Sequence, residues 1–211
     1  SFYLAVGIPD SNSGCPNNLS GTCGTVGLLR LLADGTSDAA LYINPGDPGM
    51  PDFATNERFG ASLAAVGDIN GDGAPDLVAG TPGHGSSGGL LLLALAADGT
   101  LVSASRFSEA NLALPNPLGA GADLGASMTP IPDEGGPSAV GVIVGAPFAV
   151  GPTGASTGAV LVLLGEGEGS LGLLASIDAF SDEFAQGFGP GGQGGVQQTR
   201  QPPQRRRRIG G

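Results

Sequence analysis

The sequence predicts an all-β protein built from repeated units of short strands, and three observations support this. Forty glycines and seventeen prolines among 211 residues place a turn-forming residue about every four positions, which suits short strands and opposes long helices. The apolar residues fall in short runs such as 89–95 and 140–144, far shorter than the roughly 20 residues of a membrane span. The chain also repeats itself with a period of 64 to 65 residues.

Two motifs define the repeat. The pattern FGASL occurs at 59–63, recurs as LGASM at 124–128 and begins again as GFG at 187–189, while LVAGTP at 77–82 recurs as VIVGAP at 142–147 and as LAVGIP at 4–9. Each unit has room for four strands, which in the clearest copy are expected at 61–69, 76–80, 89–95 and 101–107. Four antiparallel strands per repeat are typical of a β-propeller blade, whereas a β-sandwich needs no internal repeat.

The predicted organisation is a partial propeller. Residues 1–58 form a partial blade that lacks its first strand, 59–123 and 124–187 form complete blades, and 188–211 contain the start of a further repeat and a disordered, arginine-rich tail. Because propellers use about four to eight blades, this chain alone is not expected to close a ring.

The charge is divided unevenly along the chain. The first 189 residues hold all nineteen acidic residues and three arginines, a net charge of −16, and five arginines follow residue 190. Such a negative field repels nucleic acid and anionic lipid and favours divalent cations. The four arginines at 205–208 could form a nucleic-acid or nuclear-localisation patch, but the acidic body favours a solvated tail or a non-native end.

Cys15 and Cys23 lie in a loop rich in serine, asparagine and glycine, so a local disulfide is expected rather than a zinc site, for which nearby ligands are too few. Two unpaired thiols are the alternative. Asn18 begins an N-glycosylation triplet between the cysteines, a weak indication of export.

The segment DINGDGAPD at 68–76 carries the most specific chemistry. Oxygen-bearing residues alternate at its first, third and fifth positions, and Gly73 permits the sharp turn that brings them together. Hard oxygen ligands from a flexible loop select Ca²⁺. The predicted ligands are the side chains of Asp68, Asn70, Asp72 and Asp76 and the carbonyl group of Ala74.

This loop has two other interpretations. An EF-hand is excluded because Ala79 stands where a bidentate glutamate is needed and because a strand follows. A metal-free turn stabilised by its own aspartate side chains remains the alternative. The equivalent loop of the next unit, 133–141, keeps only Asp133, so that blade is expected not to bind calcium.

Taken together, FG at 59–60, the calcium loop at 68–76 and the motifs GTP at 80–82 and GAP at 145–147 resemble the FG-GAP repeat of integrin α-subunit propellers and of related microbial surface proteins. The resemblance covers about residues 1–189 and implies a blade whose calcium loop joins its first two strands. It also implies an extracellular or cell-surface location.

Two enzyme-like patterns are rejected. The letters GHGSSG at 83–88 fit a dinucleotide-binding loop, but a strand is expected next where that loop needs a helix. The overlapping GSSGG at 85–89 fits a serine-nucleophile motif but lacks the required strand-to-helix turn, and His84 is expected to be an exposed loop residue.

The expected function is therefore a non-catalytic, calcium-stabilised adhesion or interaction module. Its expected partners are a protein or glycan ligand and further blades of the same parent protein. The alternatives are a non-catalytic propeller attached to an extracellular hydrolase or lipase, and a structural repeat spacer.

Overall fold

The computed structural model describes residues 2–13, 15, 21–133, 139–151, 154–167 and 169–178. Within these residues the secondary structure consists of strands and turns without a helix, which confirms the all-β prediction. No helix that could cross a membrane is found in them. The strands are β1 (Phe2–Ile8), β2 (Thr25–Leu31), β3 (Ser37–Ile43), β4 (Leu63–Gly67), β5 (Asp76–Gly80), β6 (Gly89–Leu95), β7 (Leu101–Ser108), β8 (Ser127–Pro132), β9 (Ala139–Ala146), β10 (Ala159–Gly167) and β11 (Ser170–Asp178).

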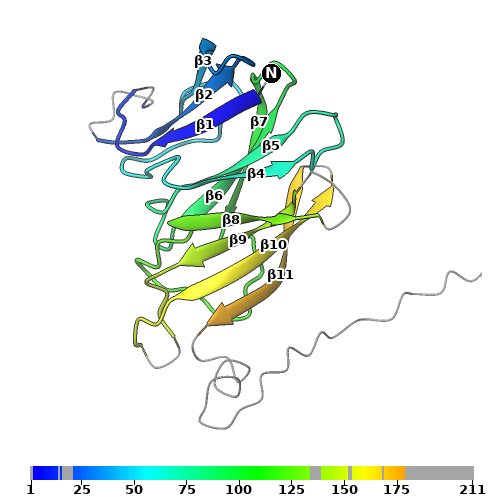
Figure 1. The fold of residues 1–211 in the computed structure, drawn as a ribbon. Helices are drawn as coiled ribbons and strands as arrows, with labels where there is room; N and C mark the ends of the chain where they lie inside the picture. Colours follow the sequence, from blue (N-terminus) through cyan, green and yellow to red (C-terminus); the bar gives the residue numbers. More distant parts are fainter. Residues whose placement is uncertain are drawn as a thin grey trace, which may run out of the picture.

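The strands form three antiparallel sheets that follow one another along the chain. The first sheet has the order β1-β2-β3, the second β4-β5-β6-β7 and the third β8-β9-β10-β11. Figure 1 shows the second sheet between the other two, and the described residues do not close into a ring.

Several strand bounds match the sequence prediction, and one differs clearly. Strands β5 and β6 begin and end where the apolar runs predict, but β4 is shorter than the expected 61–69. Its start is delayed by a turn in which the amide of Ala61 donates to the carbonyl oxygen of Arg58. Its end is set by Gly67, after which the chain enters the loop to β5.

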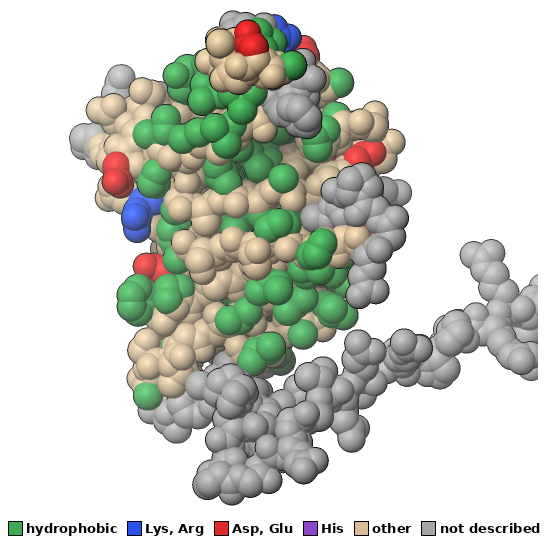
Figure 2. Space-filling model, viewed as in Figure 1, with side chains coloured by type: hydrophobic (Ala, Val, Ile, Leu, Met, Phe, Trp, Pro, Cys, Tyr) green, Lys and Arg blue, Asp and Glu red, His purple; other side chains and the backbone are tan. Residues whose placement is uncertain are grey.

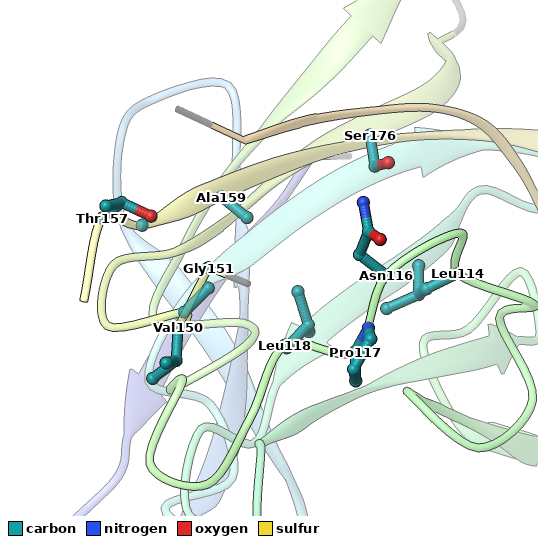
Figure 3. A pocket seen from close by; sticks show the side chains of 11 residues that line it. Leu114, Asn116, Pro117, Leu118, Val150, Gly151, Thr157, Ala159 and Ser176 are labelled. Carbon is teal, nitrogen blue, oxygen red and sulfur yellow. The ribbon is translucent and has the colours of Figure 1, made fainter. Parts of the chain in front are cut away.

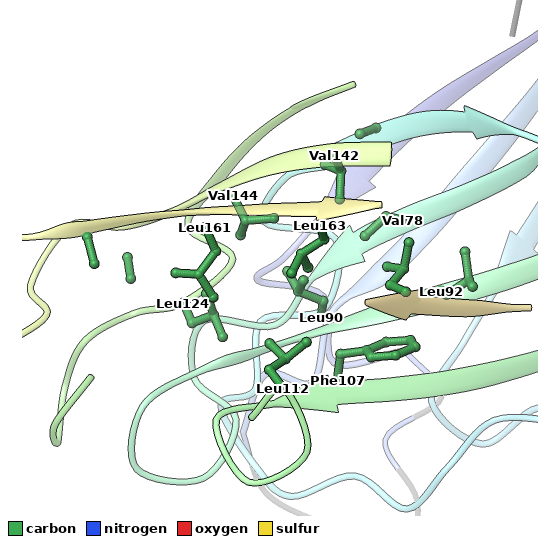
Figure 4. Packing of buried hydrophobic residues seen from close by; sticks show 14 of the residues in the cluster. Val78, Leu90, Leu92, Phe107, Leu112, Leu124, Val142, Val144, Leu161 and Leu163 are labelled. Carbon is green, nitrogen blue, oxygen red and sulfur yellow. The ribbon is translucent and has the colours of Figure 1, made fainter. Parts of the chain in front are cut away.

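Strand β6 lies at the centre of the molecule and is buried along its whole length. Because successive side chains of a strand point to opposite faces, Leu91 and Leu93 pack toward the first sheet while Leu90 and Leu92 pack toward the third. Figure 4 shows Leu90 and Leu92 among the apolar side chains that fill the second interface. All four leucines are at most 2% exposed, so the core runs through all three sheets.

The two interfaces between sheets are built alike. A parallel bridge joins Gly24 to Phe59 between the first and second units, and another joins Gly88 to Leu124 between the second and third. Both glycines have φ of 89°, a conformation that side-chain-bearing residues rarely adopt. The same backbone geometry therefore places each unit on the one before it.

Candidate metal centre

Residues 68–75 connect β4 to β5 and contain the predicted metal ligands except Asp76, which is the first residue of β5. Two exposed glycines turn the loop, Gly71 with φ of 81° and Gly73 with φ of 87°. The sharp turn expected at Gly73 is thus present, and the loop reverses direction within a few residues.

The carboxylate of Asp68 faces the interior of the loop and accepts hydrogen bonds from its backbone. Oδ1 accepts from the amides of Gly71 at 2.6 Å and Asp72 at 3.0 Å, and Oδ2 accepts from the amide of Gly73 at 2.8 Å. A carboxylate that accepts hydrogen bonds from several backbone amides fixes the conformation of the turn.

Asn70 and Asp72 are bonded to one another. The amide of Asp72 donates to Oδ1 of Asn70 at 2.9 Å, and Nδ2 of Asn70 donates to Oδ2 of Asp72 at 3.0 Å. Oδ1 of Asp72 accepts from the amide of Ala74 at 2.8 Å. Asp72 is exposed and Asn70 is half-buried, so their oxygen atoms lie at the solvent side of the loop.

Asp76 differs from the others because it is only 2% exposed. Its Oδ2 accepts from the amides of Ile69 at 3.0 Å and Asn70 at 3.3 Å, and its Oδ1 accepts from the amide of Leu95 at 3.3 Å. Desolvation by burial raises the pKa of Asp76, the negative charge of Asp72 raises it further, and the backbone hydrogen bonds lower it. Asp76 thus links the loop to the end of β6 by a hydrogen bond, and the charge of Asp72 contributes to its raised pKa.

The donor chemistry of this loop fits a hard cation, whereas the side-chain positions are those of a hydrogen-bonded turn. Within the described residues no three Asp, Glu, His or Cys side chains are grouped closely enough to hold a metal ion. None of the ion pairs found there involves Asp68, Asp72 or Asp76. Each of the three carboxylates is therefore directed to backbone amides, and none of them takes part in the ion pairs of the described residues.

Three other predictions concern the disulfide, the segments around Asn18 and 133–141, and the strand expected after residues 83–88. Cys15 and Cys23 form a disulfide, with their Cα atoms 5.6 Å apart and Cys23 fully buried. Asn18 and most of the equivalent loop of the third unit, residues 134–138, lie outside the described residues. Residues 83–88 lead into β6, so a strand follows them, as the sequence predicts.

A buried ionic cluster was not predicted. Glu57 is 1% exposed, its Oε2 accepts from Nη1 of Arg106 at 2.8 Å, and its Oε1 lies 3.0 Å from Nδ1 of His84. The same Oε1 accepts from the amide of Ala54 at 2.9 Å, and the guanidinium of Arg106 lies 4.8 Å from the centre of the Phe53 ring. The expectation that His84 is an exposed loop residue is wrong, because this pairing holds its side chain at 26% exposure.

The cluster joins residues that are 27 and 49 positions apart, so no local pattern could have indicated it. A glutamate two residues before Phe59 of the FG motif and a single arginine on β7 were the only signals. Nη2 of Arg106 also donates to the carbonyl oxygen of Asp52 at 2.8 Å. The cluster therefore fastens the linker between the first two sheets onto β7 and onto the loop before β6.

The segment that contains the metal loop is similar to a known repeat. Residues 59–93 match the FG-GAP repeat. The FG-GAP match begins at Phe59, contains β4, the loop and β5, and ends within β6. It agrees with the resemblance identified from the motifs.

No curated protein matches the sequence. Among solved structures, the chain is similar to rhamnogalacturonan lyase YesW with 14% sequence identity and a TM-score of 0.37, over 87% of this chain and 36% of that one. The chain thus spans less than two thirds of the length of that protein.

Proposed function

We propose that this chain is an extracellular, calcium-binding FG-GAP module without catalytic activity of its own, which forms part of a β-propeller and binds a protein or glycan. The FG-GAP match at 59–93 carries the proposal because it includes the acidic loop and both strands that flank it. The strongly negative body and the disulfide are consistent with a secreted, cation-binding protein.

The propeller part of the proposal is supported by the way the sheets repeat. Both internal interfaces use the same parallel bridge, and both bury alternating residues of the third strand of a unit. Further blades of the same kind, supplied by the parent protein, are the expected neighbours of the first and third sheets.

The proposed metal site uses Asp68, Asn70, Asp72 and Asp76 with the carbonyl group of Ala74. Calcium would neutralise the gathered carboxylates and cross-link the loop to β5, which stabilises the second sheet. Asp68 and Asp72 would exchange some of their backbone hydrogen bonds for the metal, because these bonds now occupy their oxygen atoms.

Calorimetric unfolding in excess Ca²⁺ and in chelator tests this site. Binding to the folded state alone stabilises it by about 2.7 kcal/mol at a hundredfold excess over the dissociation constant, so Tm is expected to rise in calcium. Asp72→Ala is expected to remove the rise. A Tm that does not depend on calcium would refute the metal assignment.

Asp98→Ala is the matched control, because Asp98 also accepts bonds from its own turn, at 3.0 Å from the amide of Thr100, but lies in the β6–β7 turn. This variant is expected to lose some stability yet keep the full response to calcium. A calcium response that survives Asp72→Ala and disappears in Asp98→Ala would place the metal elsewhere.

A further inference from the structure

A cavity of about 180 Å³ lies between the linker that follows β7 and the loop that joins β9 to β10. Its walls are mainly apolar and include Leu114, Leu118, Val150 and Ala159, with Asn116 and Ser176 as polar members. Figure 3 shows Asn116 and Leu118 extending from the linker toward the space below Ser176 and Ala159.

The backbone around this cavity repeats that of the preceding unit. The amide of Gly83 donates to the carbonyl oxygen of Glu57, and the amide of Phe148 donates to that of Ala122, both at 3.2 Å. The next bond in the loop is repeated as well, because Gly88 donates to the carbonyl oxygen of His84 at 2.9 Å and Gly158 donates to that of Ala149 at 3.1 Å. Ala122 therefore occupies the place of Glu57, and Ala149 the place of His84.

The strand register extends this correspondence to β11. Gly80 pairs with Leu90, and its repeat Gly145 pairs with Val160, so Leu91 and Leu161 are equivalent. Leu91 pairs with Arg106, and Leu161 pairs with Ser176. Ser176 therefore occupies the place of Arg106. In the linkers, Phe53 and Leu118 each stand six residues before the bridge residue that contacts the preceding unit.

In the second unit this space is filled from within the chain. The Phe53 ring lies there under the guanidinium of Arg106 and makes an edge contact with Phe59 at 5.7 Å between ring centres, and Glu57 holds the arginine in place. In the third unit each member of this cluster is replaced by a smaller neutral residue, Leu118 for Phe53, Ser176 for Arg106, Ala122 for Glu57 and Ala149 for His84. Three of these smaller residues, Leu118, Ala149 and Ser176, line the cavity, so it takes up space that their larger counterparts fill in the second unit.

We propose that this cavity is a binding site for one neutral aromatic ring of the size of a phenylalanine or tyrosine side chain. Its volume is sufficient, because apolar cavities of about 150 Å³ hold a benzene-sized molecule. The equivalent space of the preceding unit already holds such a ring. A cation is disfavoured as the ligand because the carboxylate that balances Arg106 in the second unit has no counterpart at Ala122.

A polar residue of the wall selects among aromatic ligands. Ser176 lines the cavity, where its hydroxyl group can hydrogen-bond a phenol. A phenol is therefore expected to bind more tightly than toluene, which offers only its ring. This site is independent of calcium and of the proposed adhesive function.

The test uses p-cresol, the side chain of tyrosine, added to the full chain and followed by NMR. Ring protons are expected to show nuclear Overhauser effects to methyl groups of Leu114, Leu118 and Val150. N-acetyltyrosinamide is the second ligand to be tested. If it binds as well, the site accepts a ring carried by a peptide. If only p-cresol binds, the site accepts small molecules. Absence of contacts from p-cresol to these methyl groups in the folded protein would overturn the proposal.

Leu118→Phe is the decisive variant, because it restores the residue that the preceding unit has and fills the cavity from within. It is expected to weaken p-cresol binding by about tenfold or more, since the ring and the ligand compete for one space. Leu174→Phe makes the same change on β11 at a residue that is 64% exposed and outside the cavity, and it is expected to leave binding unchanged. Unchanged binding in a folded Leu118→Phe variant would place the ligand elsewhere, and the contacts in the unsubstituted protein decide the question if that variant does not fold.

Discussion

The α-carbon of Gly80 packs against the carbonyl group of Gly125 so closely that a β-carbon on Gly80 would overlap the carbonyl oxygen. Gly7 has the same relationship to Gly60 at the interface between the first two sheets. The glycines of the GxP motifs at 7–9 and 80–82 therefore each meet the glycine at the start of the next repeat, in FG at 59–60 and in LG at 124–125. The two halves of the repeat signature are joined by one steric requirement, the close approach of two backbones.

Gly80→Ala is expected to destabilise the fold by about 1–3 kcal/mol. The added methyl group would overlap the backbone of Gly125, which cannot move away without disturbing its strand contacts. Chemical denaturation of both proteins measures this difference. Gly27→Ala is the matched control, since Gly27 lies in a strand and an added β-carbon there would be 3.6 Å from the Tyr42 ring, an ordinary contact. Equal stability of the Gly80→Ala variant and the unsubstituted protein would contradict the steric explanation.

The sequence predicted the sheets well because the information it needed is local. The apolar run at 89–95 and the turn residues on either side set the bounds of β6, and the repeat set its equivalents. For the metal loop, the spacing predicted which oxygen-bearing residues share one turn, but not that Asp68 bonds three backbone amides.

Long-range side-chain pairing was beyond prediction. The partnership of Glu57 with Arg106 depends on the register of β7 against β6 and on the path of a linker, neither of which a single sequence determines. The cavity was equally hidden, because the larger side chains that correspond to its smaller lining residues come together only in the folded second unit.

Replacing Glu57 is expected to lower the free energy of unfolding substantially. Glu57→Ala leaves the guanidinium of Arg106, whose side chain is 15% exposed, without its carboxylate, and breaking a buried pair in this way costs about 3–5 kcal/mol. Urea unfolding of Glu57→Ala, Arg106→Ala and the double variant measures the coupling. The double variant is expected to be less destabilised than the sum of the two single changes, and strict additivity would show that the two groups do not interact.

The turn between β6 and β7 has a pH-dependent contribution with a defined sign. The hydroxyl and the amide of Thr100 both donate to Oδ1 of Asp98, at 2.6 and 3.0 Å, and these hydrogen bonds lower the pKa of Asp98 below its ordinary value of 3.8. A carboxyl whose pKa is lowered by folding stabilises the fold above its unfolded pKa, and this stability is lost as pH falls through the folded pKa.

Carboxyl carbon shifts in an NMR titration measure this pKa directly. Thr100→Val removes the hydroxyl donor and is expected to raise the pKa of Asp98, while the pKa of Asp34, which Thr36 lowers in the same way, stays unchanged. Thr36→Val is expected to give the reverse result. Equal movement of both pKa values in one variant would show a general change in the protein and not a local hydrogen bond.

The outer faces of the first and third sheets are expected to cause self-association. Val160 is 39% exposed, whereas its equivalent Leu90 is fully buried by the following sheet, and Leu4 is 48% exposed, whereas its equivalent Leu77 is 5% exposed. Figure 2 shows apolar side chains gathered over the part of the molecule where the third sheet lies. Faces that match buried interfaces within the same chain can pack on one another in a head-to-tail manner.

Size-exclusion chromatography with light scattering on residues 1–189 in calcium measures this association. Combining Leu4→Asp with Val160→Asp is expected to shift the protein toward monomer, because each change places a charge on a face that must be desolvated for contact. Val102→Asp makes the same change at a residue that is 58% exposed on the outer strand of the second sheet, and it is expected to leave the association state unchanged. If the unsubstituted residues 1–189 remain a compact monomer at high concentration, these apolar faces are stable in contact with water and do not cause association.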